Sequence, residues 1–320
     1  MRHSDAWITE DTHVGDEILA GLTRPGQKEL PSRYFYDDLG SALFEAITLL
    51  PEYGLTRADL RILTTHADEI RRFGRPSLVI ELGSGGGGKA RPVLEALAQE
   101  QSILYCPIDV SASALEQCRL GLAERPEINV HPIEANFLGG LQAALRFRDG
   151  NGPALILFLG SSIGNQTPEE TAEFLAGIHR LLKTGDLFLI SADLEKDDAR
   201  MLNAYDDGLG VTAAFNLNIL RRVNREIGAD FDVSRFQHVA RYDRAQRRIE
   251  MHLMSRDEQV VRLGGGRVLR LRQGETIRTE YSYKYRLEDI RAAGRVAGFQ
   301  VEAQWVDHEW PFSQTLLKRM

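Results

Sequence analysis

The sequence predicts an α/β protein built on a doubly wound parallel sheet, together with a second domain of α+β type. One sign is the apolar run Leu78–Leu82, which is followed at once by a glycine-rich turn and then by residues with helical spacing of apolar side chains. The other sign is the regular alternation of short apolar runs with helical segments between residues 103 and 191. Together they indicate a Rossmann-like, nucleotide-binding sheet.

The expected elements follow two patterns, with strands that alternate with helices up to residue 191 and, after residue 193, helices followed by several consecutive strands. Those of the sheet domain are helix 58–73, strand 78–82, a helix opened by Lys89, strand 103–108, helix 112–123, strand 128–133, a helix near 141, strand 154–159, helix 168–182 and strand 187–191. After residue 193 we expect helices 196–205 and 211–227, strands 236–242, 248–254, 260–263, 267–271 and 276–285, helix 287–297 and a closing antiparallel pair, 298–306 and 311–318.

The change of pattern also predicts the domain borders. Residues 58–194 and 286–320 form the expected sheet domain, and residues 1–57 and 195–285 form the expected second domain. In the second domain, residues 1 to about 30 are polar and irregular in pattern, and they precede a short helix at 42–50.

The composition narrows the class of partner. With 39 basic against 46 acidic side chains, a formal charge of −7 and no basic stripe, nucleic acid is not expected as the main partner. No apolar run is long enough to cross a membrane and no secretory signal opens the chain, so we expect a cytoplasmic protein, and we expect a monomer. The two cysteines, Cys106 and Cys118, show neither a disulfide framework nor metal spacing.

The glycine turn after the first strand permits more than one ligand. Gly83, Gly85 and Gly88 satisfy the dinucleotide pattern G-x-G-x-x-G, which would make the chain an NAD-dependent dehydrogenase. Glu81 just before the turn gives Glu-x-Gly-x-Gly-x-Gly, which resembles the first motif of class I S-adenosylmethionine (SAM) methyltransferases. A carboxylate beside the sulfonium and ammonium groups of SAM is electrostatically sensible. A glycine-rich loop without a ligand is the remaining alternative.

The ends of the next strands carry further candidates, since ligands of doubly wound sheets bind at the carboxyl ends of the strands. Asp109 is placed to bind ribose hydroxyls, or alternatively to cap the following helix. Asn136 and Phe137 could bind and stack on adenine, although a plain loop is the competing interpretation. The turn Gly160–Asn165 faces the reacting group, and Lys89 suggests a ligand carboxylate unless it is an exposed surface lysine.

Ten segments spread over nearly the whole chain, in order and at similar spacing, carry a closer resemblance. The segments are Tyr34-Phe-Tyr36-Asp, Leu50-Pro-Glu-Tyr53, Glu81-Leu-Gly-Ser-Gly85, Phe158-Leu-Gly-Ser-Ser-Ile-Gly-Asn165, Ala204-Tyr205-Asp-Asp, Val211-Thr-Ala-Ala-Phe-Asn, Ala229-Asp-Phe-Asp, Phe236-Gln-His-Val-Ala-Arg241, Arg248-Ile-Glu-Met251 and Thr279-Glu280-Tyr-Ser282. This set resembles the histidine Nα-methyltransferases of ergothioneine biosynthesis. The resemblance implies SAM as the methyl donor and L-histidine, with its mono- and dimethylated forms, as the acceptor that becomes hercynine.

The same resemblance implies roles for individual residues. Cofactor contacts fall on Gly83, Gly85, Lys89, Asp109, Asn136 and Phe137, where Asn136 replaces an Asp of the family. Substrate contacts fall on Tyr53, Asn165, Tyr205, Glu280, Ser282 and Met251, and the residues nearest to the reacting amine are Asn165, Gly160 and Tyr36. No metal and no dedicated base are implied.

The residue types suit histidine chemically. Glu280 and Ser282 are two apart on an expected strand, so they share a face and could bind the two imidazole nitrogens. An amphipathic strand with a solvated face is the alternative from the residues alone. Three other functions remain open at this point: methylation of another aromatic or indole amine such as tryptophan, NAD-dependent dehydrogenation, and SAM binding without catalysis. His238 and His252 are expected to be structural or exposed.

Overall fold

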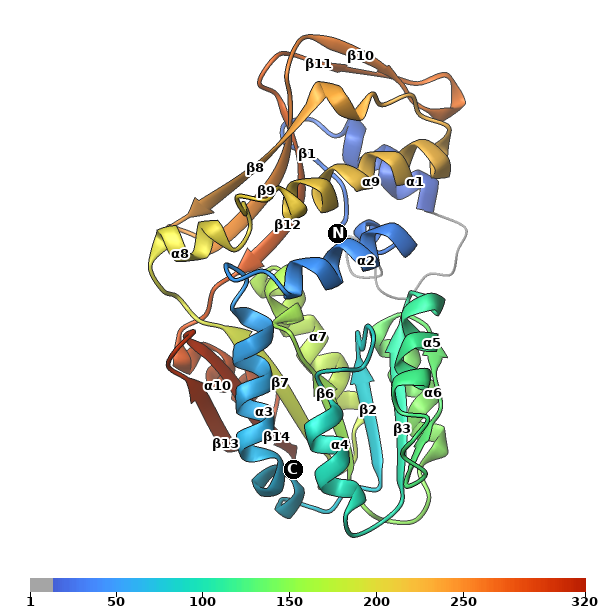
Figure 1. Cartoon of the computed structure of the whole chain (residues 1–320), viewed down its shortest axis with the longest axis vertical. Helices are drawn as coiled ribbons and strands as arrows, with labels where there is room; N and C mark the ends of the chain where they lie inside the picture. Colours follow the sequence, from blue (N-terminus) through green and yellow to red (C-terminus); the bar gives the residue numbers. More distant parts are fainter. Residues whose placement is uncertain (1–13) are drawn as a thin grey trace. The chain divides into compact units, whose positions relative to one another are not determined.

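The computed structural model of the chain describes residues 14–320 and divides the chain into two compact units (Figure 1). The Rossmann unit contains Gly54–Glu195 and Tyr283–Met320. The aromatic unit contains the residues up to Tyr53 and Lys196–Ser282. The expected domain borders, after residues 57, 194 and 285, lie a few residues from these.

The Rossmann unit is built on a mixed eight-stranded sheet. Its strands are β2 (Leu78–Leu82), β3 (Ile103–Asp109), β4 (Ile128–Val130), β5 (Ile133–Glu134), β6 (Ala154–Phe158), β7 (Leu187–Asp193), β13 (Phe299–Asp307) and β14 (Phe312–Arg319). The strand order is β13-β14-β7-β6-β2-β3-β4, and β5 also pairs with β3. Strands β2 to β7 run parallel, whereas β14 is antiparallel to both β7 and β13. The predicted doubly wound α/β fold is therefore confirmed.

Helices cover the sheet of this unit on both faces. They are α3 (Leu55–Arg72), α4 (Arg91–Ala98), α5 (Ala112–Gly121), α6 (Phe137–Ala144), α7 (Pro168–Leu181) and α10 (Leu287–Val296). Residues of α6, α7 and α10 join the strands in one apolar cluster, in which Ile80, Phe158 and Phe188 are fully buried. Each such side chain contributes about 1.5–3 kcal/mol by leaving water. Figure 1 shows α3 and α4 lying across the other face.

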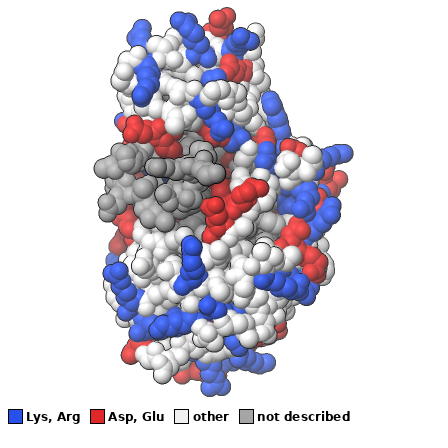
Figure 2. All heavy atoms as spheres, turned by 180° about the vertical axis from the view of Figure 1, so that it is seen from behind, with Lys and Arg blue, Asp and Glu red and all other residues white. Residues whose placement is uncertain are grey.

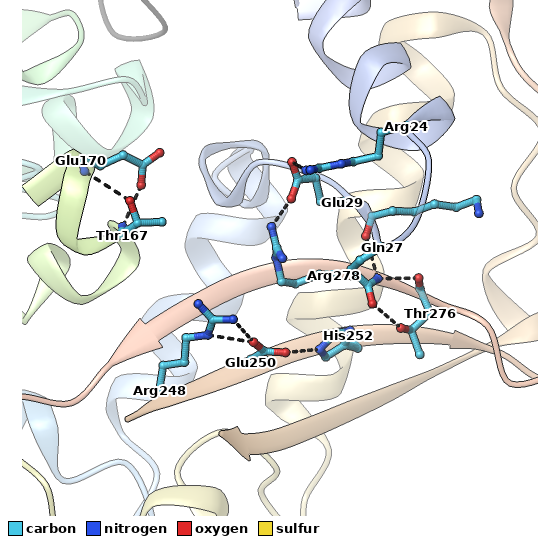
Figure 3. A network of polar contacts seen from close by, with 11 residues as sticks. Arg24, Gln27, Glu29, Thr167, Glu170, Arg248, Glu250, His252, Thr276 and Arg278 are labelled. Atoms are coloured by element: carbon cyan, nitrogen blue, oxygen red, sulfur yellow. Dashed lines mark hydrogen bonds and ion pairs between the residues drawn. The ribbon is translucent and has the colours of Figure 1, made fainter. Parts of the chain in front are cut away.

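The aromatic unit has a four-stranded sheet of order β1-β12-β9-β8 and a separate hairpin, β10–β11. Its elements are α1 (Val14–Thr23), β1 (Lys28–Glu29), α2 (Asp38–Thr48), α8 (Asp198–Asn203), α9 (Val211–Ile227), β8 (Phe236–Asp243), β9 (Arg248–Ser255), β10 (Gln259–Arg262), β11 (Val268–Leu271) and β12 (Thr276–Tyr283). Helix α9 packs on β8 and β9. Figure 3 shows how Glu250 on β9 accepts hydrogen bonds from Arg248 and His252.

Charged side chains of both signs are intermixed on the face drawn in Figure 2. None of the helices among residues 14–320 is long and apolar enough to cross a membrane.

Three local expectations were wrong. Part of the N-terminal segment expected to be irregular forms helix α1, because Ile18 and Leu22 are four residues apart and both are fully buried; residues 1–13 lie outside the described part of the chain. Helix α3 begins at Leu55 rather than at residue 58. The single strand expected at 128–133 is two short strands, which Pro132 separates, since proline has no amide hydrogen for a ladder.

Candidate active site

The two loops nearest to the centre of the parallel sheet begin at Gly83 and Gly160. Strands β2 and β6 are neighbours in the sheet, although β3, β4 and β5 lie between them in the chain. The chain therefore winds in opposite directions on the two sides of this pair, and ligands of doubly wound sheets bind at such a reversal, beyond the carboxyl ends of the strands. Gly83 follows β2, and Gly160 follows β6 after one further residue.

The loop after β2 requires glycine for two physical reasons. Gly83, Gly85 and Gly87 have φ values of 72°, 51° and 75°, in the left-handed region that side chains avoid. A Cβ on Gly83 would also lie 3.3 Å from the ring of Phe137, and a Cβ on Gly87 would lie 2.4 Å from Sγ of Cys118. The loop thus presents bare backbone, as a closely held ligand requires.

Gly88 separates the two possible glycine fingerprints. In a dinucleotide-binding loop the third glycine permits close packing of the helix on the strand. Here Gly88 is exposed, and a Cβ added to it would meet nothing within 4 Å. The match to G-x-G-x-x-G is therefore one of letters only, and the structure gives no packing reason for a glycine at this position.

Asp109 at the end of β3 holds the glycine loop. Its Oδ2 accepts a hydrogen bond from the Gly85 amide at 2.8 Å, and its Oδ1 accepts one from the Ser111 amide at 3.0 Å. The alternative role as helix cap belongs instead to Ser111, whose hydroxyl accepts from the Ala114 amide at 3.3 Å. Asp109 is half-buried, and each carboxylate oxygen has a further lone pair with which it could accept from a ribose hydroxyl.

Glu81, inside β2, is a fully buried carboxylate. The Tyr105 hydroxyl donates to its Oε2, while its Oε1 has no hydrogen-bond partner among the described residues. Burial raises the pKa of Glu81 to about 7, although Lys89 and Tyr105 act in the opposite direction. The buried oxygen without a partner suits a cationic ligand at the glycine loop.

Lys89 lies close to the loop after β6. The first helical residue after the glycine loop is Arg91, so Lys89 does not open α4 as expected but precedes it. A Cβ on Gly160 would lie 3.3 Å from Nζ of Lys89. The ammonium group also favours the charged forms of two buried acids, Glu81 and Asp59. Lys89 is thus a half-buried cation among carboxylates rather than an exposed surface lysine.

The adenine candidates differ in their surroundings. Asn136 is exposed, and its Oδ1 accepts from the Gly139 amide at 2.8 Å, so it caps α6. The ring of Phe137 packs against those of Phe158 and Phe174, with centroids 5.2 and 6.1 Å apart, and it borders Gly83. Phe137 is therefore fixed beside the glycine loop.

The turn after β6 is held in an uncommon backbone conformation. Gly160 has φ of 73° and the next residue, Ser161, has φ of 60°, which is unusual for a residue other than glycine. The Gly160 amide donates to Oδ2 of buried Asp59 at 2.7 Å, and the Asp193 amide donates to Oγ of Ser161 at 2.9 Å. Asn165, half-buried, ends the short 3-10 helix that follows.

The expected substrate residues of the aromatic unit include three rings of one cluster. Tyr36 lies 5.7 Å from Phe44, Phe44 lies 6.3 Å from Tyr53, and Tyr53 lies 6.3 Å from Tyr205, all between ring centroids. The pairs are edge-to-face, a geometry that stabilises aromatic contacts. Tyr53 and Tyr205 are buried, whereas Tyr36 is half-buried.

Tyr205 joins this cluster to strand β12. Its hydroxyl lies 2.6 Å from Oγ of Ser282, and its carbonyl lies 2.7 Å from Nε2 of His238. Nδ1 of His238 lies 2.8 Å from Nδ2, the side-chain amide nitrogen, of Asn216. Since that nitrogen can only donate, Nδ1 accepts and the hydrogen of His238 is on Nε2. Burial lowers the pKa of His238, which is consistent with a neutral ring and with the structural role expected for it.

A buried polar network also fixes the strand next to Glu280. Oγ1 of Thr279 lies 2.7 Å from Oδ1 of Asn216 and 3.1 Å from the carbonyl of Met251, which is buried as well. Tyr281, which follows Glu280, has two guanidinium groups over its ring. Their Cζ atoms, of Arg248 and Arg278, lie 3.7 and 3.9 Å from the ring centroid. Glu280 itself is half-buried.

The candidates thus form one set in each unit. In the Rossmann unit, hydrogen bonds and close contacts join the glycine loop, Asp109, Phe137, Lys89 and Gly160. In the aromatic unit, they join Tyr36, Tyr53, Tyr205 and Ser282. The sequence interpretation missed Asp59, Asn216 and Thr279, whose bonds connect residues far apart in the chain. Among residues 14–320 no group of three or more His, Cys, Asp or Glu side chains is arranged to hold a metal ion.

Comparison with known proteins gives one consistent family. Residues 14–319 match the family model described as "Histidine-specific methyltransferase, SAM-dependent". The chain is 40% identical to the histidine N-alpha-methyltransferase of Mycolicibacterium smegmatis, over 95% of this chain and 94% of that one. It is 33% identical to ergothioneine biosynthesis protein 1 of Neurospora crassa, over 94% of this chain and 35% of that longer one.

A more distant relative has a different printed substrate. The L-tryptophan methyltransferase of Psilocybe serbica is 24% identical, over 97% of this chain and 94% of that one. The family model nevertheless spans almost all the described residues, and the bacterial relative matches along nearly its whole length. The chain therefore belongs to the family of SAM-dependent, histidine-specific methyltransferases.

Proposed function

We propose that the chain transfers methyl groups from SAM to the α-amino nitrogen of L-histidine, three times in succession, and so forms hercynine in ergothioneine biosynthesis. The observation that carries this proposal is the match of residues 14–319 to the histidine-specific family. The names of the bacterial and fungal relatives support the position of methylation and the pathway. Mono- and dimethylhistidine are then substrates in turn, and the enzyme acts as a monomer.

The Rossmann unit is the cofactor side. Backbone at Gly83 and Gly85 lies against SAM, Asp109 accepts from its ribose, and Phe137 with Asn136 holds adenine. The carboxylate of SAM pairs with Lys89. SAM supplies an activated methyl group, whose bond to sulfur breaks with the electron pair staying on sulfur while the amine nitrogen forms its new bond. The buried Oε1 of Glu81, without a hydrogen-bond partner among the described residues, favours this positively charged ligand.

Recognition of the acceptor uses neutral donors at one end and a carboxylate at the other. Tyr53, Tyr205 and Asn165 donate to the carboxylate of histidine. Glu280 accepts from one imidazole N–H, and the hydroxyl of Ser282 bonds to the other ring nitrogen. Since Ser282 and Tyr205 lie within hydrogen-bond distance of each other, the two ends of the substrate are read by neighbouring groups. Met251 lines the same region.

The protein contributes orientation to the chemical step. Each transfer requires the amine in its neutral form with its lone pair directed at the methyl carbon, and such alignment accounts for much of the acceleration of group transfers. The Gly160 carbonyl and Asn165 orient the amine, and the Tyr36 phenol is the third group proposed to act on it. After each of the first two transfers the methylated amine loses one proton to water or to a phenol, whereas the third transfer gives a quaternary ammonium and releases no proton. No metal is required.

The test is incubation of the purified chain with SAM and L-histidine, followed by mass spectrometry. We expect trimethylhistidine, with three molecules of S-adenosylhomocysteine formed per histidine consumed, and no loss of turnover in EDTA. Parallel incubations with tryptophan and phenylalanine should give little product. Preferred methylation of tryptophan would favour the indole alternative, and tight S-adenosylhomocysteine binding without any product would indicate a non-catalytic module. Binding of NADH in place of S-adenosylhomocysteine would overturn the cofactor assignment.

A further inference from the structure

Asp59, in the second turn of α3, is a fully buried carboxylate with three hydrogen-bond donors around it. Its Oδ2 accepts from the Gly160 amide at 2.7 Å. Its Oδ1 accepts from the Ser191 hydroxyl at 2.8 Å and from the Gln314 side-chain amide at 2.5 Å. The donors come from residues 101, 132 and 255 positions away in the chain, so only the folded sheet assembles this site.

One oxygen of Asp59 is anchored to the most rigid part of the unit. Ser191 and Gln314 are directly opposite each other on the antiparallel strands β7 and β14, and both are fully buried. Paired strands inside a sheet are among the least mobile elements of a protein. Oδ1 is therefore fixed by the sheet, and Oδ2 transmits that position to the loop after β6.

The recipient of this bond is a peptide that needs outside support. Gly160 and Ser161 both have left-handed backbone conformations, and for a residue such as serine this conformation persists only where neighbours enforce it. Asp59 holds the amide of Gly160, and the Asp193 amide donates to the Ser161 hydroxyl. Lys89 also lies against Gly160, since its Nζ would lie 3.3 Å from a Cβ on Gly160.

The chemistry of the three donors requires an acceptor on both oxygens of residue 59. Burial raises the pKa of Asp59, whereas Gln314, Lys89, Ser191 and Gly160 act against that rise. A carboxylate satisfies all three donors at once, and its bond to the Gly160 amide is stronger than that of a neutral oxygen.

We propose that Asp59 is a positioning residue for methyl transfer: it fixes the amide of Gly160, and through the left-handed conformation of Gly160 it sets the direction of the Gly160 carbonyl and the start of the turn that ends at Asn165. This inference rests on the proposed function, in which these two groups orient the substrate amine. Asp59 touches neither substrate nor cofactor in this account. It acts on kcat, since a misplacement of about 1 Å at a reacting centre costs about 100-fold in rate.

Two substitutions of Asp59 and one matched control test the proposal. Asp59→Ala removes the acceptor of the Gly160 amide and should lower kcat about 100-fold. Asp59→Asn keeps one oxygen; Oε1 of Gln314, which has no partner among residues 14–320, can accept from the new amide after a flip of the Gln314 side chain. It should lower kcat only several-fold, with release of mono- and dimethylhistidine because the amine is held less firmly. Ser191→Ala removes one of the two anchors of Oδ1 but leaves the bonds of Asp59 to Gln314 and to the Gly160 amide in place, so its kcat should fall far less than that of Asp59→Ala.

The measurements are kcat and KM for histidine, the product distribution, the affinity for S-adenosylhomocysteine and the urea midpoint of each variant. We expect the affinity for S-adenosylhomocysteine to stay close to that of the wild type in all three. If the decrease in kcat is proportional to the decrease in the urea midpoint, with the same proportionality for Ser191→Ala and for both Asp59 variants, Asp59 has only a structural role and the proposal is wrong. If Asp59→Ala does not fold, Asp59→Asn decides alone, and a wild-type kcat with only trimethylated product overturns the proposal. A wild-type enzyme that forms no methylated histidine overturns the proposed function and this inference together.

Discussion

At the glycine loops of the Rossmann unit aspartate carboxylates hold backbone amides, whereas around Tyr205 and Asn216 of the aromatic unit neutral side chains hold one another. Asp109 accepts from the Gly85 amide, and Asp59 accepts from the Gly160 amide. In the aromatic unit, Tyr205 bonds to Ser282, and Asn216 connects His238 with Thr279. The first arrangement leaves backbone atoms open to close approach by a ligand, and the second positions the side chains that we propose to contact the substrate.

This difference indicates how each unit should respond to change. Backbone in the left-handed region cannot accept a Cβ without strain, so the cofactor side should be intolerant of small additions. A neutral network loses one bond at a time, at about 0.5–1.5 kcal/mol each, so single substitutions in the aromatic unit should lower its free energy of unfolding in smaller steps.

The largest effect is expected from Gly87→Ala. The added Cβ would lie 2.4 Å from Sγ of Cys118, and φ at Gly87 is 75°. Left-handed strain and overpacking each cost about 1–3 kcal/mol. We expect a clear fall in the free energy of unfolding and loss of most S-adenosylhomocysteine binding, measured by urea titration and calorimetry. Gly88→Ala is the control, since a Cβ there meets nothing within 4 Å; equal damage from both substitutions would contradict the account.

Asp109→Ala is expected to be the next most damaging to cofactor binding. It removes the proposed ribose acceptor and also the acceptor of the Gly85 and Ser111 amides. Loss of a charged hydrogen bond corresponds to about 1.5–3 kcal/mol of binding, or roughly 10- to 150-fold in affinity. Asp109→Asn should lose less, because it retains one acceptor oxygen. Unchanged S-adenosylhomocysteine affinity in Asp109→Ala, by calorimetry, would remove Asp109 from the cofactor site.

The sequence predicted the positions of the glycine loop and of Asp109 better than the residues that support the loop after β6. Strand, glycine turn and helix are local, so the position of the loop and of Asp109 after the next strand follows from pattern alone. Asp59 gave no such signal: an acid on an amphipathic helix has the pattern of a solvated residue, and its three donors lie between 101 and 255 residues away. For the same reason the helix of α1 was missed, since its apolar residues become meaningful only once Ile18 and Leu22 are seen to be buried.

A moderate effect is expected from Tyr205→Phe in the aromatic unit. The substitution removes the hydroxyl that lies 2.6 Å from Oγ of Ser282 but keeps the ring in its cluster. In the proposed function the same hydroxyl donates to the carboxylate of histidine, and loss of a hydrogen bond to a charged group is worth about 1.5–3 kcal/mol, so kcat/KM for histidine should fall roughly 10- to 150-fold. S-adenosylhomocysteine affinity should be unchanged. A fall in S-adenosylhomocysteine affinity with no change in kcat/KM for histidine would show that Tyr205 serves cofactor binding and not substrate binding.

A further prediction concerns the difference in pH dependence between the two units. The folded-state pKa of Glu81, about 7, lies above its ordinary 4.5, so the folded state binds this proton more tightly and the Rossmann unit loses stability as the pH rises from about 4.5 to 7. The pKa of His238 is lowered below its ordinary 6.5, so the aromatic unit loses stability as the pH falls below about 6.5.

Amide hydrogen exchange, corrected for the intrinsic rate at each pH, can follow both units in one sample. Between about pH 5 and about pH 7, protection of β2 and β3 should decrease and protection of β8 and α9 should increase. Glu81→Gln should weaken the first trend, to which Asp59 also contributes because its pKa is raised as well, and should leave the second. If Glu81→Gln alters neither trend, the buried carboxylate is not the source of the pH dependence.

The central claim is that the substrate side selects histidine through its imidazole, and Glu280→Ala tests it most directly. A site with buried polar groups strongly rejects a substrate that leaves them without partners. The measurement is kcat/KM for histidine, tryptophan and phenylalanine in the wild type and in Glu280→Ala. We predict that the wild type strongly prefers histidine, and that the variant loses about 1.5–3 kcal/mol, or roughly 10- to 150-fold, for histidine while its relative use of the two apolar amino acids rises. Wild-type discrimination in Glu280→Ala would show that Glu280 does not read the substrate and would contradict the account.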